Sequence, residues 1–505
     1  MNTEKLQNLL LYRYRYWMAY IVMAGAAIGG LVYKLESLLP GLSPLEVEQG
    51  LHVAEDSTAI LEQGIYLPYN LLQAISFSVL GESTLALRLP SIIFAALTLA
   101  MLYALIHMWH KEKIAIITVT FVATSSWFLT FARLGTPFIY SAFCVVLIFM
   151  CGTLLRHAEH KRLVLVFAAL ALPLTLYSPY MIYLLALFAI LYQKEIRSIV
   201  KAMSTSNLVL VLLVGSFTLL PLIYGFVSSQ ENLKEWLGIA DGFPGIGAFF
   251  QNIMASVEHL LWGSESNPEL HLGTLPMLDI FTATMTALGL YHYEQHFNWM
   301  RTRFIIYGLG IMLVLFGLSA SEGLYFIALP IVYILAATGI VTLLGQWNKI
   351  FPVNPFARTL ALLPLVFAVL ITSQYHLDRY FSAWASSPST REVYAVEPSL
   401  LEEHLEARSD ERILIVTRTS EHASLRFLLN DQTDKRIEIA EPRGSQLVDL
   451  ENRFDTVYLD GQTSEQEKAI LDKYISETIL GDRESRPVAY RVYDISTKVG
   501  SALEF

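Results

Sequence analysis

Two carboxylates stand two residues apart in a long loop that follows the first apolar segment of this 505-residue chain. They are Glu46 and Glu48. A carboxylate held in a fixed position can act as a general base that removes a proton from a hydroxyl group. If the segment is helical, the two side chains point about 200° apart and only one can face a given pocket. If it is extended, both share a face. A solvated loop acid without a chemical role is the alternative that spacing leaves open.

The residues just before the carboxylates predict the start of a short helix. Ser43 can cap such a helix, with Pro44 at its first position. Glu46 would then lie in the first turn, near the positive end of the helix dipole.

Three basic side chains are candidates for binding an anion. Arg88 and Arg133 stand at one end of the second and third apolar segments, and each could bind a phosphate group. Pairing with a carboxylate, or snorkelling to the membrane surface, is the alternative for both arginines. His271 lies in a second long loop, near Glu265 and Glu269, and a solvated histidine is an equal alternative to a ligand.

The elements that must position these residues are membrane helices. The chain is 54% hydrophobic and 16% charged, with a mean hydropathy of +0.47, whereas soluble domains have about 25% charged residues. A transmembrane helix needs about 20 mostly apolar residues. We predict about eleven such spans, near residues 16–34, 86–107, 114–131, 136–155, 162–177, 179–193, 206–227, 276–292, 303–319, 323–344 and 359–374.

The basic residues predict the orientation of these spans, because cytoplasmic loops carry an excess of Lys and Arg. Up to the last predicted span, one set of loops holds 15 basic residues, and the other set holds only Lys34, Arg88, Arg133 and Lys234. We therefore expect a multi-pass protein of the cell membrane with a cytoplasmic N-terminus. Both long loops, about 36–88 and 228–276, and the C-terminal part would be external. Within the first loop, Asn70 to Leu80 is too short to span and is expected to lie at the membrane interface.

Two domains are expected: a membrane domain over residues 1–374 and a small external α/β domain over residues 375–505. In the second domain, strands are predicted at 412–417, 436–439, 454–459 and 490–495, and helices at 421–429 and 464–475. Strands that alternate with helices favour a parallel or mixed sheet. This domain contains no glycine-rich phosphate loop and no metal-spaced set of His and Cys, so we interpret it as a cover or a partner-binding domain.

The remaining composition excludes several classes of protein. The net charge of −10 lies mostly after Gln374 and gives no basic stripe for nucleic acid. Cys144 and Cys151 lie on one face of a single predicted span, so disulfides are not expected to support the external parts. Transporters usually carry ionisable residues in the middle of their spans, and these predicted spans have almost none there, which argues against a transporter. A divalent cation at the external carboxylates stays open, although no ligand spacing argues for one.

Several linked motifs make the chain resemble the GT-C superfamily of integral-membrane glycosyltransferases, closest to its protein-mannosyltransferase-like and aminoarabinose-transferase-like branches. The resemblance rests on the acidic segment 44–50 after the first span and on the run from Gly81 through Arg88 to Pro90-Ser91. It also rests on Phe131-Ala132-Arg133-Leu134-Gly135 and on Asn267-Pro268 through Leu278. The order and topology of these pieces together carry the match.

The resemblance implies a GT-C bundle that transfers a sugar from a polyprenyl-phosphate donor to a protein, lipid or glycan acceptor on the external face. Glu46 is the first choice of base and Glu48 the second, with Arg88, Arg133, His271 and Tyr325 near the donor phosphate or substrate. The chain departs from the family where Leu45 replaces the first acid and where Tyr325 stands in place of an arginine. A degenerate member that binds lipid or serves as a scaffold without transfer is therefore the alternative function.

Overall fold

The computed structural model describes the larger part of the chain. That part comprises residues 15–39, 41–55, 57–157, 161–239, 242–263, 267–271, 273–319, 321–351, 356, 360, 362–394, 400–401, 404–405, 412–417, 424–427, 429, 436–440, 453–460, 471, 474–483 and 486–498.

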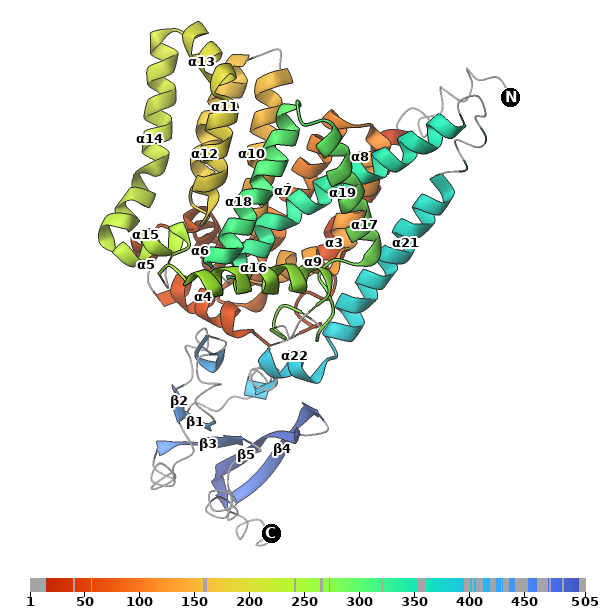
Figure 1. The fold of residues 1–505 in the computed structure, drawn as a ribbon. Coiled ribbons are helices and arrows are strands. Elements are labelled where there is room, and N and C mark those ends of the chain that lie inside the picture. The colour runs from red at the N-terminus through yellow and green to blue at the C-terminus, as the bar shows by residue number, and fades with distance from the viewer. Residues whose placement is uncertain are drawn as a thin grey trace. The chain divides into compact units, whose positions relative to one another are not determined.

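Helices dominate the described chain (Figure 1). Five of them are long and apolar enough to cross a membrane: α7 (Thr84–Trp109), α10 (Phe138–His157), α14 (Thr205–Ser228), α18 (Met300–Leu318) and α19 (Gly323–Ile350). A sixth crossing arises if α8 (Glu112–Thr124) and α9 (Ser126–Arg133), which meet at an angle of 64°, form one broken span. The chain is thus a multi-pass membrane protein, and the count of about eleven spans stays a prediction.

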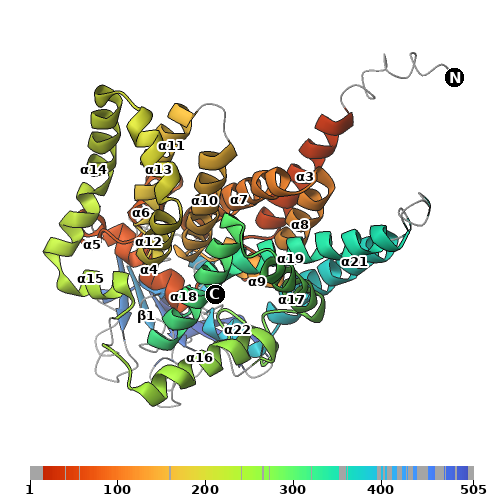
Figure 2. The same cartoon turned by 45° about the horizontal axis from the view of Figure 1, so that its top comes forward.

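Shorter apolar helices occupy the other predicted spans. They are α3 (Arg15–Val32), α11 (Lys161–Thr175), α12 (Met181–Leu191), α17 (Ile280–Gln295) and α21 (Leu362–Asp378). Helices α10, α11 and α14 pack side by side, and α12 packs on α18, as two views agree (Figure 2). Tyr177-Ser178-Pro179 lies in the turn between α11 and α12, where the sequence predicts a break.

Small residues let helices α17 and α19 approach closely. Gly289 of α17 faces the backbone of Leu335, and Gly339 of α19 faces the backbone of Met285. A side chain at either glycine would overlap a backbone carbonyl oxygen of the other helix. This is the close packing that small residues permit between membrane helices, and it fixes α19, which carries Tyr325.

The connecting segments contain further helices. Those of the first long loop are α4 (Pro44–Glu55), α5 (Ser57–Gln63) and α6 (Leu67–Leu80). Those elsewhere are α13 (Gln193–Ala202), α15 (Gln230–Leu237), α16 (Ile246–Leu261), the π-helix η1 (Arg379–Trp384) and α22 (Pro388–Val393). The apolar stretch from Asn70 to Leu80 is helical, and its helix begins three residues earlier, at Leu67.

The C-terminal part contains a mixed five-stranded sheet of order β2-β1-β3-β5-β4. Its strands are β1 (Arg412–Val416), β2 (Arg436–Ala440), β3 (Thr456–Asp460), β4 (Tyr474–Arg483) and β5 (Arg486–Lys498). Strand β1 pairs in parallel with β2 and β3, whereas β5 is antiparallel to β3 and β4. Apolar residues are buried on both faces of the sheet, which is why β1 is a continuous apolar run.

The predicted strands β1, β2, β3 and β5 are confirmed, and β4 was not predicted. The helix predicted over 464–475 is wrong at its end, because Tyr474 and Ile475 belong to β4. Pairing with β5 outweighs the local helix signal there. Residues 464–470 lie outside the described residues. Of the helix predicted over 421–429, residues 424–427 and 429 are helical.

The chain divides into two compact units. The first comprises Met1–Leu35, Asp56–Gln73 and Arg88–Ala383, and the second comprises Glu36–Glu55, Ala74–Leu87 and Trp384–Phe505. Helix α4 therefore belongs to the same unit as the C-terminal sheet. The predicted domain boundary near residue 374 stays a prediction.

Candidate active site

Glu46 is held in place by the start of its own helix. The backbone N–H of Glu46 donates to Oγ of Ser43 over 3.2 Å, and the backbone N–H of Ser43 donates to Oε2 of Glu46 over 3.3 Å. These reciprocal bonds form a capping box. The structure thus confirms Ser43 as a cap and Glu46 in the first turn of α4, and it adds that the Glu46 carboxylate completes the cap.

The helical geometry separates the two predicted carboxylates. Glu46 is fully buried, whereas Glu48 is exposed. Because α4 is helical, the alternative in which both side chains share a face does not apply. A buried carboxylate with a fixed position suits a general base, and the same position also suits a purely structural cap.

Arg88 and Arg133 are buried, and together they bind backbone carbonyl groups in the last turn of α3 and in the turn that follows it. Arg88 Nη1 donates to the carbonyl of Leu35 over 2.8 Å. Arg133 donates to the carbonyls of Gly30 and Lys34, each over 3.1 Å. The C-terminal carbonyls of a helix attract cations, so both arginines stabilise the end of α3.

Arg133 also packs against aromatic rings. Its guanidinium carbon lies 4.9 Å from the ring centre of Phe381 and 5.4 Å from that of Tyr380. Its Nε atom is buried and has no hydrogen-bond partner among the described residues. Two of the three guanidinium nitrogens of Arg133 therefore donate hydrogen bonds to the protein backbone, so few of its N–H groups can bind a ligand.

His271 and Tyr325, predicted from separate parts of the sequence, meet around a third residue. His259 of α16 lies with its ring centre 4.6 Å from that of His271 and 5.2 Å from that of Tyr325. All three side chains are buried. Glu322, just before α19, completes the group, with its Oε2 atom 3.9 Å from Nε2 of His271. We call these four residues the His259 cluster.

The His259 cluster combines neutral and ionisable groups. The pKa of His259 is lowered to about 4, mainly by burial; the nearby His271 and Arg379 also lower it, and Glu322 raises it. His259 is therefore uncharged at neutral pH. Nε2 of His271 and Oε2 of Glu322 are both buried and make no hydrogen bond with the described residues. Imidazole, carboxylate and phenol groups in this arrangement can bind the hydroxyl groups of a saccharide or the oxygens of a phosphate.

His259 was not predicted as a site residue, although the sequence contains a usable signal. It follows Ser256 by three residues on α16, and these two are the buried polar side chains of that helix. Residues three apart lie on one helical face. The shared face of Ser256 and His259 is the signal that the sequence offers for His259.

A second polar network braces the segment that carries His271. His376 of α21 contacts Oγ of Ser126 through Nδ1 and Oδ2 of Asp279 through Nε2, each over 2.9 Å. Asp279 also caps α17 by accepting from the backbone N–H groups of Phe281 and Thr282. This network joins α9, α17 and α21.

Arg379 adds a further tie to this segment. It donates to the carbonyls of Pro276 and Leu275 over 2.7 and 3.3 Å. The chain between His271 and α17 is thus held at both Asp279 and these two carbonyls.

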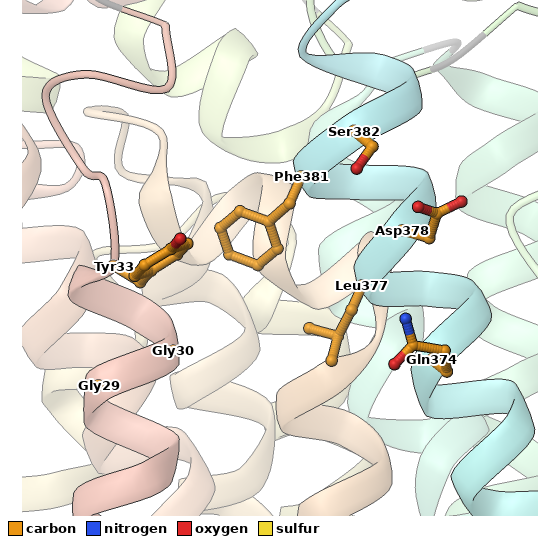
Figure 3. A pocket seen from close by; sticks show the side chains of 8 residues that line it. All are labelled: Gly29, Gly30, Tyr33, Gln374, Leu377, Asp378, Phe381 and Ser382. Atoms are coloured by element: carbon orange, nitrogen blue, oxygen red, sulfur yellow. The ribbon is translucent and has the colours of Figure 1, made fainter.

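A groove of about 470 Å³ lies between the end of α3 and the end of α21. Tyr33 and Phe381 face each other across it, with ring centres 5.6 Å apart (Figure 3). None of the predicted site residues lines this groove. Arg133 fixes its wall through the Gly30 carbonyl and the Phe381 ring.

The predicted site residues fall into both units. Glu46 and Glu48 belong to the unit that contains the sheet, and Arg88, Arg133, His271 and Tyr325 belong to the helical unit. Within the helical unit, Phe131 of α9, two residues before Arg133, lies edge-on to the ring of His271. Among the described residues, no group of three or more His, Cys, Asp or Glu side chains is placed to hold a metal ion.

Comparisons with known proteins agree with this architecture. The family model of dolichyl-phosphate-mannose-protein mannosyltransferases matches residues 67–223. The fold is similar to that of ArnT from Cupriavidus metallidurans bound to undecaprenyl phosphate, with a TM-score of 0.53 at 10% identity over 94% of this chain and 98% of that one. The apo form of ArnT gives a TM-score of 0.52 at 11% identity, with the same coverage.

An oligosaccharyltransferase from Archaeoglobus fulgidus, tethered with an acceptor peptide, is also similar. Its TM-score is 0.50 at 12% identity over 94% of this chain and 74% of that one. A search of curated proteins by sequence finds no match. The chain has the fold of the GT-C superfamily, and the resemblance predicted from its sequence is confirmed.

Proposed function

We propose that this protein transfers a glycosyl group from a polyprenyl-phosphate-linked donor to an acceptor on the external face of the membrane. Three findings support this function. The fold is similar to that of ArnT with undecaprenyl phosphate and to that of an oligosaccharyltransferase with an acceptor peptide. The matching family model describes mannosyltransferases that use dolichyl phosphate mannose. The acceptor would be a protein, a lipid or a glycan.

The observation that carries the proposal is the buried, fixed carboxylate of Glu46. In the transfer step, an acceptor oxygen would attack the anomeric carbon of the sugar while the bond from that carbon to the phosphate oxygen breaks. Glu46 would take the proton of the acceptor hydroxyl. The lipid phosphate would leave as an anion, which requires positive charge or hydrogen-bond donors nearby and no proton.

We propose that His271 and Tyr325, together with His259, bind the donor phosphate or the sugar. Their buried groups can donate hydrogen bonds to phosphate oxygens. Arg88 and Arg133 would contribute positive potential near the same end of the helices, while their hydrogen bonds hold α3. Glu48 is the second candidate for the base, although its exposure on α4 makes it less suited to this role.

We also propose the finer architecture predicted from the sequence. About eleven spans would form a membrane domain over residues 1–374, and residues 375–505 would form an external domain. The N-terminus would be cytoplasmic. The excess of basic residues in one set of loops supports this orientation.

A non-catalytic, lipid-binding scaffold is the second candidate function. The capping box favours it, because the cap alone accounts for a buried carboxylate at position 46. Leu45, in place of the first acid of the family pair, points the same way.

Substitution of Glu46 by Gln separates the two functions. A glutamine at the third helical position also completes a capping box, so Glu46→Gln keeps the cap and removes the base. For the purified protein with polyprenyl-phosphate sugars, we expect turnover to fall roughly 100-fold or more, with little change in donor binding. Ser43→Ala is the matched control, because it removes the cap and keeps the carboxylate. Turnover by Glu46→Gln equal to that of the native protein would contradict Glu46 as the base, and the same test on Glu48→Gln would then show whether the second acid is the base. Donor binding without any turnover by the native protein would instead favour the scaffold.

A further inference from the structure

A glycine in the middle of α4 is explained by a residue of the C-terminal part. Gly50 is a poor helix former, yet α4 continues through it to Glu55. A Cβ atom at position 50 would lie 2.6 Å from Cε2 and 3.0 Å from Cδ2 of Phe427. The ring of Phe427 therefore lies directly on the backbone of α4, where any larger residue would displace it.

The contact is part of a closed apolar cluster. Phe427 is fully buried, and it packs with Leu42, Val47 and Leu87. The ring centre of Phe77 lies 5.9 Å from that of Phe427. Val47 and Gly50 come from α4, Phe77 from the end of α6 and Leu87 from the start of α7, and Leu42 lies two residues before α4. We call the set Leu42, Val47, Gly50, Phe77 and Leu87 the Phe427 socket.

The helical segment that carries Phe427 is anchored on its other side by the sheet. Leu425 and Leu429 are buried with Ile413 and Ile415 of β1. Residues four apart share a helical face, and a residue two positions away points to the opposite side. The segment therefore has one face on the sheet and the other in the socket, so it transmits the position of the sheet to α4.

Gly50 also lies one turn after Glu46, and hence on the same face of α4. We propose that Phe427 is a positioning residue that fixes the placement and rotation of α4, and thereby the carboxylate of Glu46. The C-terminal domain would then support the proposed base rather than act as a detached cover. This inference rests on the proposed function, and it adds a role for the domain that the sequence left open.

Three substitutions in the full-length protein test the proposal. Phe427→Ala empties the socket. Gly50→Ala forces the ring away, although alanine by itself favours the helix. The double variant Gly50→Ala with Phe427→Leu removes the ring atoms that the new methyl group would meet. Phe454→Ala is the matched control, since Phe454 is buried in the core on one face of the sheet and belongs to a different cluster.

Hydrogen exchange of the α4 amides gives the first readout and needs no activity. We expect exchange to rise at least about tenfold in Phe427→Ala and in Gly50→Ala, and to return toward the native rate in the double variant. Exchange in α4 that stays at the native rate in Phe427→Ala would overturn the proposal. So would an equal rise in Phe454→Ala, because the effect would then come from general loosening of the domain.

Kinetics give the second readout. In the two single variants, kcat should fall roughly 10- to 100-fold, as for a base displaced by about 1 Å, while KM for the donor changes less than about threefold. The double variant should recover most of the lost kcat. A native protein that transfers no sugar would contradict the proposed function, and the exchange measurements would still decide the contact. If hydrogen exchange in α4 rises in the single variants while kcat stays at the native value, Phe427 holds the helix without positioning a base. That result would overturn the inference.

Discussion

At the scale of single residues, the carboxylate of Glu46 has a structural partner in Ser43. The pattern Ser-x-x-Glu places Ser43 at the cap and Glu46 in the first turn of α4, and their two hydrogen bonds are a local consequence of that spacing. A group fixed in this way loses little conformational entropy if it also takes a proton from a substrate. The two roles are therefore compatible, and only a substitution that keeps one of them can separate them.

His259 predicts a pH dependence of stability. Its native pKa of about 4 lies below the ordinary value of 6.5, mainly because of burial. Between these values the unfolded state binds more protons than the native state, so stability should rise from pH 4 to pH 6.5 and then level off. The total effect is on the order of 3 kcal/mol. Thermal unfolding of the purified protein in detergent across this range measures it.

The variant His259→Gln is the control for this effect, because it removes the titrating group from the His259 cluster. The difference in Tm between the native protein and the variant should change between pH 4 and pH 6.5 and stay constant above pH 6.5. A difference that is independent of pH over the whole range would show that His259 is not buried as a neutral group.

The site residues differ in how far the sequence could predict them. Glu46 and Ser43 were predictable, because a helix cap depends on a local pattern. His271 and Tyr325 were singled out from the sequence, but their meeting through His259 depends on how α16 and α19 pack. Backbone carbonyls have no sequence signature, so the hydrogen-bond partners of Arg88 and Arg133 could not be predicted.

At the scale of elements, the end of α3 is held by two arginines from other helices. Arg88 comes from α7 and Arg133 from α9, and together they bind three carbonyls within residues 30–35. Helix termini leave such carbonyls without intrahelical partners. The two arginines thus connect α3 with α7 and α9.

Substitution of Arg133 by Lys tests whether this residue serves the fold or the donor. Lysine lacks the planar fork that binds two carbonyls and stacks on Phe381. We expect Arg133→Lys to lower stability by about 2 kcal/mol, with a lower Tm, while KM for the donor stays near the native value. Thermal unfolding and donor titration measure the two quantities.

Arg156→Lys is the matched control for this substitution. Arg156 is partly exposed and lies 3.9 Å from Glu195, and such surface pairs contribute little to stability. A large rise in KM with an unchanged Tm in Arg133→Lys would instead assign Arg133 to the donor phosphate.

At the scale of the whole molecule, hydropathy predicted where the helices lie but not how they break. The third predicted span, 114–131, is the bent pair of α8 and α9, which meet at Ser125. No proline or glycine marks that bend; the hydroxyl of Ser125 accepts a hydrogen bond from Tyr333 of α19. The sequence did not predict strand β4 for a similar reason. This strand forms through its pairing with β5, and a local sequence pattern does not show that pairing.

The predicted orientation can be tested with introduced cysteines, because the two native ones are buried. In a variant with Cys144 and Cys151 replaced by Ala, a cysteine is placed at Lys113 or at Ser476, both of which are exposed. If the N-terminus is cytoplasmic and the number of spans is odd, a membrane-impermeant thiol reagent should label position 476 in intact cells and position 113 only after permeabilisation. Labelling of 113 in intact cells, or protection of 476 until permeabilisation, would contradict this topology. Because α4 shares a compact unit with the sheet, protection of 476 would also argue against an external location for Glu46 and hence against sugar transfer on that face.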